Sequence, residues 1–226
     1  KGPAMTDIFA AKLAPLHLLQ HPFYMDWIQG KITQGQLQDY AAQYYHHVDA
    51  FPRYLGAIHS LCENAEQRRT ILENLNDEEG VTYGTPHPEL WLQFAEGMGA
   101  DRAAVQAGTP RAAIQNVMDT FFGHARRSFH EGLGALYAYE AQVPEVADSK
   151  ITGLKTQYGV TDARTLQFFE VHKSADVVHR QVLKDILDKL PETQKQEAAA
   201  AAESAAQALW DFLTEVHQPE AQRAAA

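Results

Sequence analysis

Apolar residues recur at helical spacing along almost the whole chain, and this periodicity constrains the fold more than any other feature. The clearest case begins at Thr33, which with Gln36 matches the capping box of a helix start. The apolar positions that follow share one helical face: Leu37, Tyr40, Ala41, Tyr44, Tyr45, Val48 and Phe51. No convincing run alternates as a half-buried strand would. The sequence therefore predicts an all-α protein.

The pattern predicts a bundle of seven or more helices without a linker long enough to divide it. Longer helices are expected over residues 6–20, 33–62, 65–80, 111–124, 128–142, 162–190 and 192–216, with shorter ones over 22–30 and around Trp91 and Lys150. The alanine-rich stretch near 200 is expected to be helical because alanine is the strongest helix former. We predict one domain over residues 5–218, a tag remnant at 1–4 and a disordered tail at 219–226.

Charge and cysteine content exclude several classes of protein. The formal net charge is −10 and the basic residues are scattered, which argues against binding nucleic acid or an anionic membrane through a basic surface. No apolar run is long enough to span a membrane, and no signal peptide precedes the first predicted helix. Cys62 is the single cysteine, so no internal disulfide can form. Together these features predict a cytoplasmic protein.

The helix predicted at 162–190 carries three polar residues on an apolar face. His172, Asp176 and His179 are spaced by four and three, so their side chains lie on one side of a helix. Burying two imidazoles and a carboxylate is costly unless something pairs with them, and a divalent metal is one such partner. The alternative is a polar helix face with solvated histidines.

Two glutamates also occupy positions that the helical pattern points inward. Glu140 continues the row of Phe129, Leu133 and Leu136, whereas Glu78 continues the row of Ile71 and Leu75. A buried carboxylate needs a cation or several donors. Each could instead pair with a core arginine or reach water at a helix end.

His87 adds a third imidazole, although a histidine before a proline at a helix start is often a loop residue. The six candidate ligands are Glu78, His87, Glu140, His172, Asp176 and His179. Three carboxylates and three imidazoles suit two first-row metals such as iron or manganese inside a bundle. The Glu-x-x-His motif of the familiar di-iron bundles is absent, so such a site would be wired differently.

Several motifs in chain order resemble one known family. They are HPFYMDWIQGKITQGQLQDYAAQYYHHVDAFPRYLGAIHS, NLNDEEG, HPELW, LYAYEAQVPEVADSKI and the helix with His172, Asp176 and His179. The chain resembles the family of the Chlamydia protein associating with death domains, over about residues 8–216. That family belongs to the haem-oxygenase-like di-metal oxidases, whose fold is shared with TenA thiaminases and pyrroloquinoline-quinone synthase.

The resemblance implies a cytoplasmic, oxygen-dependent oxygenase that forms p-aminobenzoate for folate from one of its own tyrosines. Matched by motif, the cleaved residue is Tyr24 and the amino donor is Lys150, while Tyr40 and Tyr139 line the same cavity. It also implies the six metal ligands above, two divalent metal ions, O₂, an external reductant and a homodimer. The loop after Glu78 is longer than in the chlamydial protein, which leaves Glu79 as an alternative ligand.

Other functions compete with this hypothesis. An oxidase of a free small molecule, like pyrroloquinoline-quinone synthase, would use the same fold. A TenA-like hydrolase is disfavoured because Cys62 is not in the later position of that nucleophile. A non-enzymatic helical interaction protein is suggested only by the relative's name, since nothing in the sequence resembles a partner-binding groove.

Overall fold

The computed structural model describes residues 7–82 and 84–223, apart from the side chains of 175, 176, 220 and 223. The described regular elements are all helical, which confirms the predicted all-α bundle. The α-helices are α1 (Ile8–Leu13), α2 (Pro22–Ile28), α3 (Gln34–Leu61), α4 (Ala65–Glu78), α5 (His87–Gly97), α6 (Arg102–Ala107), α7 (Ala112–Arg127), α8 (Phe129–Glu140), α9 (Val143–Gln157), α10 (Ala163–Asp188), α11 (Glu192–His217) and α12 (Glu220–Arg223).

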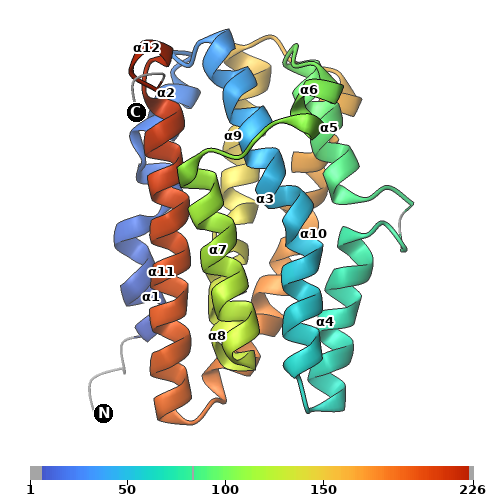
Figure 1. The fold of residues 1–226 in the computed structure, drawn as a ribbon, viewed down its shortest axis with the longest axis vertical. Coiled ribbons are helices and arrows are strands. Elements are labelled where there is room, and N and C mark those ends of the chain that lie inside the picture. The colour runs from blue at the N-terminus through green and yellow to red at the C-terminus, as the bar shows by residue number, and fades with distance from the viewer. Residues whose placement is uncertain (1–6, 83, 224–226) are drawn as a thin grey trace.

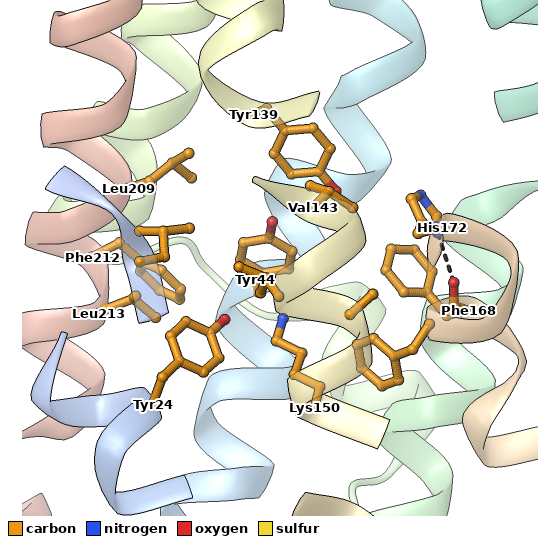
Figure 2. Close-up of a pocket in the computed structure, with 14 residues that line it drawn as sticks. Tyr24, Tyr44, Tyr139, Val143, Lys150, Phe168, His172, Leu209, Phe212 and Leu213 are labelled. Atoms are coloured by element: carbon orange, nitrogen blue, oxygen red, sulfur yellow. Dashed lines mark hydrogen bonds between the residues drawn. The ribbon is translucent and has the colours of Figure 1, made fainter. Parts of the chain in front are cut away.

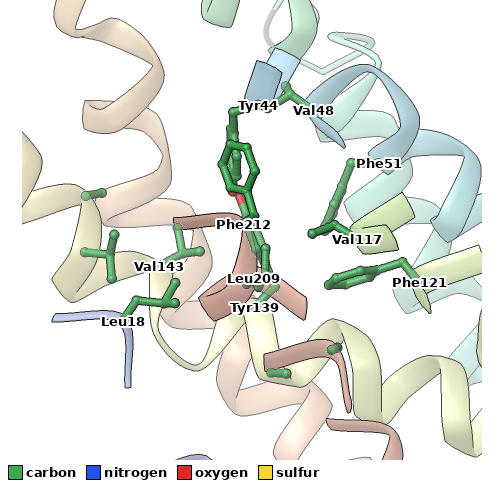
Figure 3. Close-up of a cluster of buried hydrophobic side chains, with 14 of the residues drawn as sticks. Leu18, Tyr44, Val48, Phe51, Val117, Phe121, Tyr139, Val143, Leu209 and Phe212 are labelled. Atoms are coloured by element: carbon green, nitrogen blue, oxygen red, sulfur yellow. The ribbon is translucent and has the colours of Figure 1, made fainter. Parts of the chain in front are cut away.

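The long helices lie roughly along the longest axis of the molecule (Figure 1). Helix α11 packs against α8, α7 and α1, and α10 packs against α9, α5 and α8. Aromatic and aliphatic side chains fill the space between them, with Tyr44 of α3 facing Phe212 of α11 at a ring separation of 5.8 Å (Figure 3). The core is therefore closed by helices from both ends of the chain.

The alanine-rich segment forms the inner face of α11, as the helical prediction requires. Its buried members are Ala198, Ala199, Ala201, Ala202, Ala205, Ala206 and Ala208. A Cβ placed on Gly134 of α8 would lie 2.0 Å from the carbonyl oxygen of Ala198. Small residues on both helices thus allow their backbones to approach closely.

Three local predictions differ from the structure. The helix expected over 6–20 ends at Leu13 and continues as two 3₁₀ turns, 14–16 and 18–20, because Pro15 cannot continue an α-helix. Helix α6 was not predicted, since its six residues are too few to show periodicity. Within the tail predicted to be disordered, Glu220–Arg223 form one helical turn, in which the amide of Gln222 donates to the carbonyl of Pro219. The predicted tag remnant at 1–4 lies outside the described residues.

Among the described residues, no helix is both long and apolar enough to cross a membrane.

Candidate metal centre and tyrosine cavity

Three buried side chains from three helices converge in the bundle. Glu78 ends α4, His87 begins α5 and His172 lies midway along α10. The Nδ1 atom of His87 is 2.9 Å from Oε2 of Glu78, and one ligand atom from each of the three lies within 4.8 Å of the others. A compact set of two imidazoles and a carboxylate, closed off from solvent, fits a divalent metal ion.

His172 is held in a state suited to binding metal. Its Nδ1–H donates to the carbonyl of Phe168 at 2.7 Å (Figure 2). The proton is therefore on Nδ1, and the lone pair of Nε2 is available to bind a metal. Burial, assisted by the nearby His87, keeps the pKa of His172 well below its ordinary value. The imidazole is therefore neutral near pH 7, as a ligand must be.

Two further predicted ligands lie together beside this cluster. The Oε2 atom of Glu140, at the end of α8, is 3.9 Å from Nδ1 of His179, and Oε1 accepts a 2.7 Å hydrogen bond from Asn74. The other nitrogen of His179 is 3.3 Å from a carboxylate oxygen of Asp77. His179 is near enough to lower the pKa of His172. Glu140 and His179 thus form a second polar pair, and only Glu78, His87 and His172 form a compact set of ligand atoms among the described residues.

The remaining predicted ligands are placed as follows. The backbone of Asp176 continues α10, but its side chain lies outside the described residues. Glu79 is exposed at the end of α4, whereas Glu78 is buried against His87. Asn74 and Asp77 were not anticipated, although Asn74 lies one helical turn before Glu78 on the same face.

A cavity of about 30 Å³ borders His172 of this cluster. Figure 2 shows residues that line it. It is bordered by Tyr24, Tyr44, Tyr139, Lys150, Phe168 and His172, among others. His172 thus belongs both to the cluster and to the cavity wall. The volume holds one or two water molecules and no larger ligand.

Lys150 is buried in a cage of aromatic rings. Its Nζ lies 5.0 to 5.8 Å from the ring centroids of Tyr24, Tyr40, Tyr44, Trp91 and Phe169. It donates a 2.5 Å hydrogen bond to the hydroxyl of Tyr40. Burial lowers the pKa of Lys150 to about 7. In a large share of the molecules, Lys150 is consequently a neutral amine at physiological pH.

Tyr24 and Tyr40 both face this amine, with ring centroids 5.4 and 5.0 Å from Nζ of Lys150, and each affects the pKa of the other. Burial raises the pKa of both tyrosines above the ordinary value, so both remain protonated. Tyr139 borders the same cavity from the last turn of α8, next to Glu140. Of the four residues predicted from the resemblance to be catalytic, Tyr24, Lys150 and Tyr139 border the cavity, whereas Tyr40 does not line it and is linked to it through its hydrogen bond with Lys150.

Comparisons with known proteins agree with this architecture. A family model described as iron-containing redox enzyme matches residues 38–211. The chain is 40% identical to 4-aminobenzoate synthase of Nitrosomonas europaea over 89% of this chain and 86% of that protein. It is also 40% identical to 4-aminobenzoate synthase of Chlamydia pneumoniae, over 92% of each.

Among solved structures, a TenA homologue from Pseudomonas syringae has a TM-score of 0.80 at 13% identity, covering 97% of this chain and 98% of that one. At that identity the likeness concerns the fold alone. The family match spans the metal cluster on α4, α5 and α10, while Tyr24 precedes it. The chain belongs to the haem-oxygenase-like family of iron-containing redox enzymes, in the group that includes these 4-aminobenzoate synthases.

Proposed function

We propose that this enzyme forms 4-aminobenzoate from the side chain of its own Tyr24, with Lys150 as the amino donor. The observation that carries the proposal is that the buried amine of Lys150 lies 5.4 Å from the centroid of the Tyr24 ring, in a cavity that is also bordered by His172, a predicted metal ligand. The carbon skeleton of 4-aminobenzoate, a ring with one further carbon in the para position, is also that of a tyrosine side chain. Cleavage between Cα and Cβ of Tyr24 would release it.

The proposed reaction needs oxidising equivalents near Tyr24, and His172, a predicted metal ligand, borders the same cavity as Tyr24. Two divalent ions, iron, manganese or both, together with O₂ and an external reductant, would supply them. The proposed ligands are Glu78, His87, Glu140, His172, Asp176 and His179. The protein itself would keep the Tyr24 phenol buried and protonated.

Lys150 and Tyr40 have complementary parts in the proposed reaction. The neutral amine of Lys150 has a lone pair for attack on the oxidised ring at the carbon that bears the hydroxyl, whose oxygen would leave as water. Oxidation of the Cε–N bond by equivalents from O₂, followed by hydrolysis, would leave the nitrogen on the ring and an aldehyde on the Lys150 side chain. Tyr40 would orient the amine through the hydrogen bond that it accepts from Lys150, and its hydroxyl could take up or return a proton of that amine. Tyr139 would act as an oxidisable ring between the metal ligands and the cavity.

The size of the cavity favours an internal substrate over a free one. Sites for small-molecule substrates are roughly 300–1,000 Å³. The 30 Å³ beside Tyr24 admits no aromatic molecule, whereas the Tyr24 ring is already enclosed there. An oxidase of a free small molecule would require this part of the core to open.

Isotope labelling tests the proposal. Protein containing ring-labelled tyrosine and ¹⁵N-lysine is loaded with iron and manganese and exposed to O₂ and a reductant. Mass spectrometry should find the labelled ring and the labelled nitrogen in the released 4-aminobenzoate. The mass of the protein should fall by that of the Tyr24 side chain. Tyr24→Phe should give no product. Unlabelled 4-aminobenzoate, or undiminished product from Tyr24→Phe, would overturn the proposal.

A further inference from the structure

Helix α2, which carries Tyr24, is fixed at its start by contacts that do not involve the Tyr24 ring. The Nδ1 atom of His21 accepts the backbone N–H of Phe23 at 2.9 Å and so caps the helix. Its Nε2 lies 2.9 Å from the hydroxyl of Thr214 on α11. His21 is 2% exposed, so both contacts are sheltered from water. One residue thus caps α2 and ties it to α11.

The other end of α2 is fixed in a similar way. Asp26 lies 2.7 Å from Nε2 of His217, again on α11. Trp27 donates from Nε1 to the backbone carbonyl of Lys150 at 3.3 Å. A Cβ on Gly153 would come within 2.4 Å of the Trp27 ring, so α2 already lies as close to α9 as the glycine permits. Helix α2 therefore cannot move further towards α9 to fill a space left at position 24.

The space left by the Tyr24 side chain would have the shape and polarity of its ring. Phe23 and Trp27 border the ring at centroid distances of 5.3 and 6.3 Å. Leu213 and Phe212 border the cavity that adjoins it. Packed cores relax only partly when a large side chain is removed, and an apolar cavity of ring size binds benzene in another protein. Here the space would also have a polar side, since the amine of Lys150 lies 5.4 Å from the centroid of the Tyr24 ring and donates to the hydroxyl of Tyr40.

We propose that a chain that has lost the Tyr24 side chain is a binding site for small, neutral, para-substituted phenols. The aromatic ring of the ligand occupies the place of the Tyr24 ring, its hydroxyl bonds Tyr40, and its para substituent points towards the backbone of α2. The inference rests on the proposed function, because that reaction is what would create such a chain from the natural sequence. The protein that remains after the reaction would then bind such phenols.

The test uses p-cresol, which is the tyrosine side chain as a free molecule, and toluene, which lacks the hydroxyl. Calorimetric titration of metal-free Tyr24→Gly should show p-cresol binding, and wild-type protein should show none. Toluene should bind about 2- to 12-fold more weakly, the net contribution of one hydrogen bond. In a Tyr24→Gly/Tyr40→Phe double variant this preference should disappear.

A second variant, Tyr24→Ala, guards against poor folding of the glycine variant, with circular dichroism as the check that each is helical. Absence of p-cresol binding by both helical variants, equal binding by wild type, or equal affinities for p-cresol and toluene would overturn the inference. Wild-type protein should also acquire p-cresol binding after reaction with metals, O₂ and reductant. Because Lys150 would lose its nitrogen in the reaction, Tyr24→Gly/Lys150→Met is the variant that matches reacted wild type. If that double variant binds p-cresol but reacted wild type does not, the proposed function fails and the binding site stands.

Discussion

At the scale of single residues, Lys150 has the least ordinary environment, since an ammonium group is rarely buried among aromatic rings. Its pKa of about 7 in the folded chain compares with 10.5 when exposed. Between these values the unfolded chain binds more protons than the folded one, so the free energy of unfolding rises with pH across that window. Below pH 7 both states are protonated and this dependence ends.

We expect Lys150→Met to remove the pH dependence of stability that arises from this lysine. Chemical unfolding of both proteins between pH 7 and 10.5 should show the wild type gaining stability relative to the variant as the pH rises. Lys155→Met is the matched control, because Lys155 lies on the same helix with its side chain 48% exposed. If the difference in the free energy of unfolding between wild type and Lys150→Met stays constant over that pH range, the lowered pKa of the buried amine is contradicted.

Asn74 is expected to hold Glu140 in the orientation that binds metal. Asn74→Ala removes the donor to Oε1 of Glu140, and loss of such an orienting bond typically weakens metal binding by about 10- to 100-fold. Competition with a chelator measures the affinity, with Asn76→Ala as a control two residues further along the same helix. Equal affinities in the two variants would show that Asn74 has no such part.

The sequence could identify inward-facing ligands but not the bonds between helices. Glu78 and His172 stand out because each continues an apolar row, and the structure brings both to His87. Asn74 and Asp77 have no distinguishing spacing, and their importance comes from α8 and α10 lying opposite α4. The contact between Lys150 and Tyr40 spans 110 residues and likewise depends on how the helices pack.

At the scale of the helices, local signals predicted the boundaries best where a capping residue is present. Thr33 and Gln36 form the expected capping box, and α3 begins at Gln34. Helix α6 shows the limit, since it is short and is held by longer-range contacts of Arg102 with Glu89 and Glu96. Such ion pairs cannot be read from periodicity.

The close approach of α8 and α11 predicts opposite effects for two glycine substitutions. Gly134→Ala should destabilise the protein by about 1–3 kcal/mol, because the new methyl meets the backbone of Ala198. Gly123→Ala, in α7, meets nothing within 4 Å and should stabilise it by about 0.5–1 kcal/mol. Urea unfolding of the two variants gives the comparison. Equal and small effects would mean that α11 can shift away from α8.

At the scale of the whole molecule, metal binding should couple to stability, since the cluster joins α4, α5 and α10. Metal at about 100 times its Kd stabilises the folded state by about 2.7 kcal/mol. For a chain of this length that raises Tm by roughly 5–11 °C. Calorimetry with and without iron or manganese measures the shift, which His172→Ala should abolish. An equal shift in that variant would place the bound metal elsewhere.

The homodimer implied by the resemblance stays a prediction.

Glu78 and His87 stand at the two ends of the loop that joins α4 to α5. An ion bound by both residues would hold the two ends of that loop together. Val81 within it is 70% exposed, so a protease can reach the backbone at this residue. Limited proteolysis should therefore nick the metal-free chain at this loop faster than the loaded one. The rate of that cut would report on metal occupancy without any assay of product.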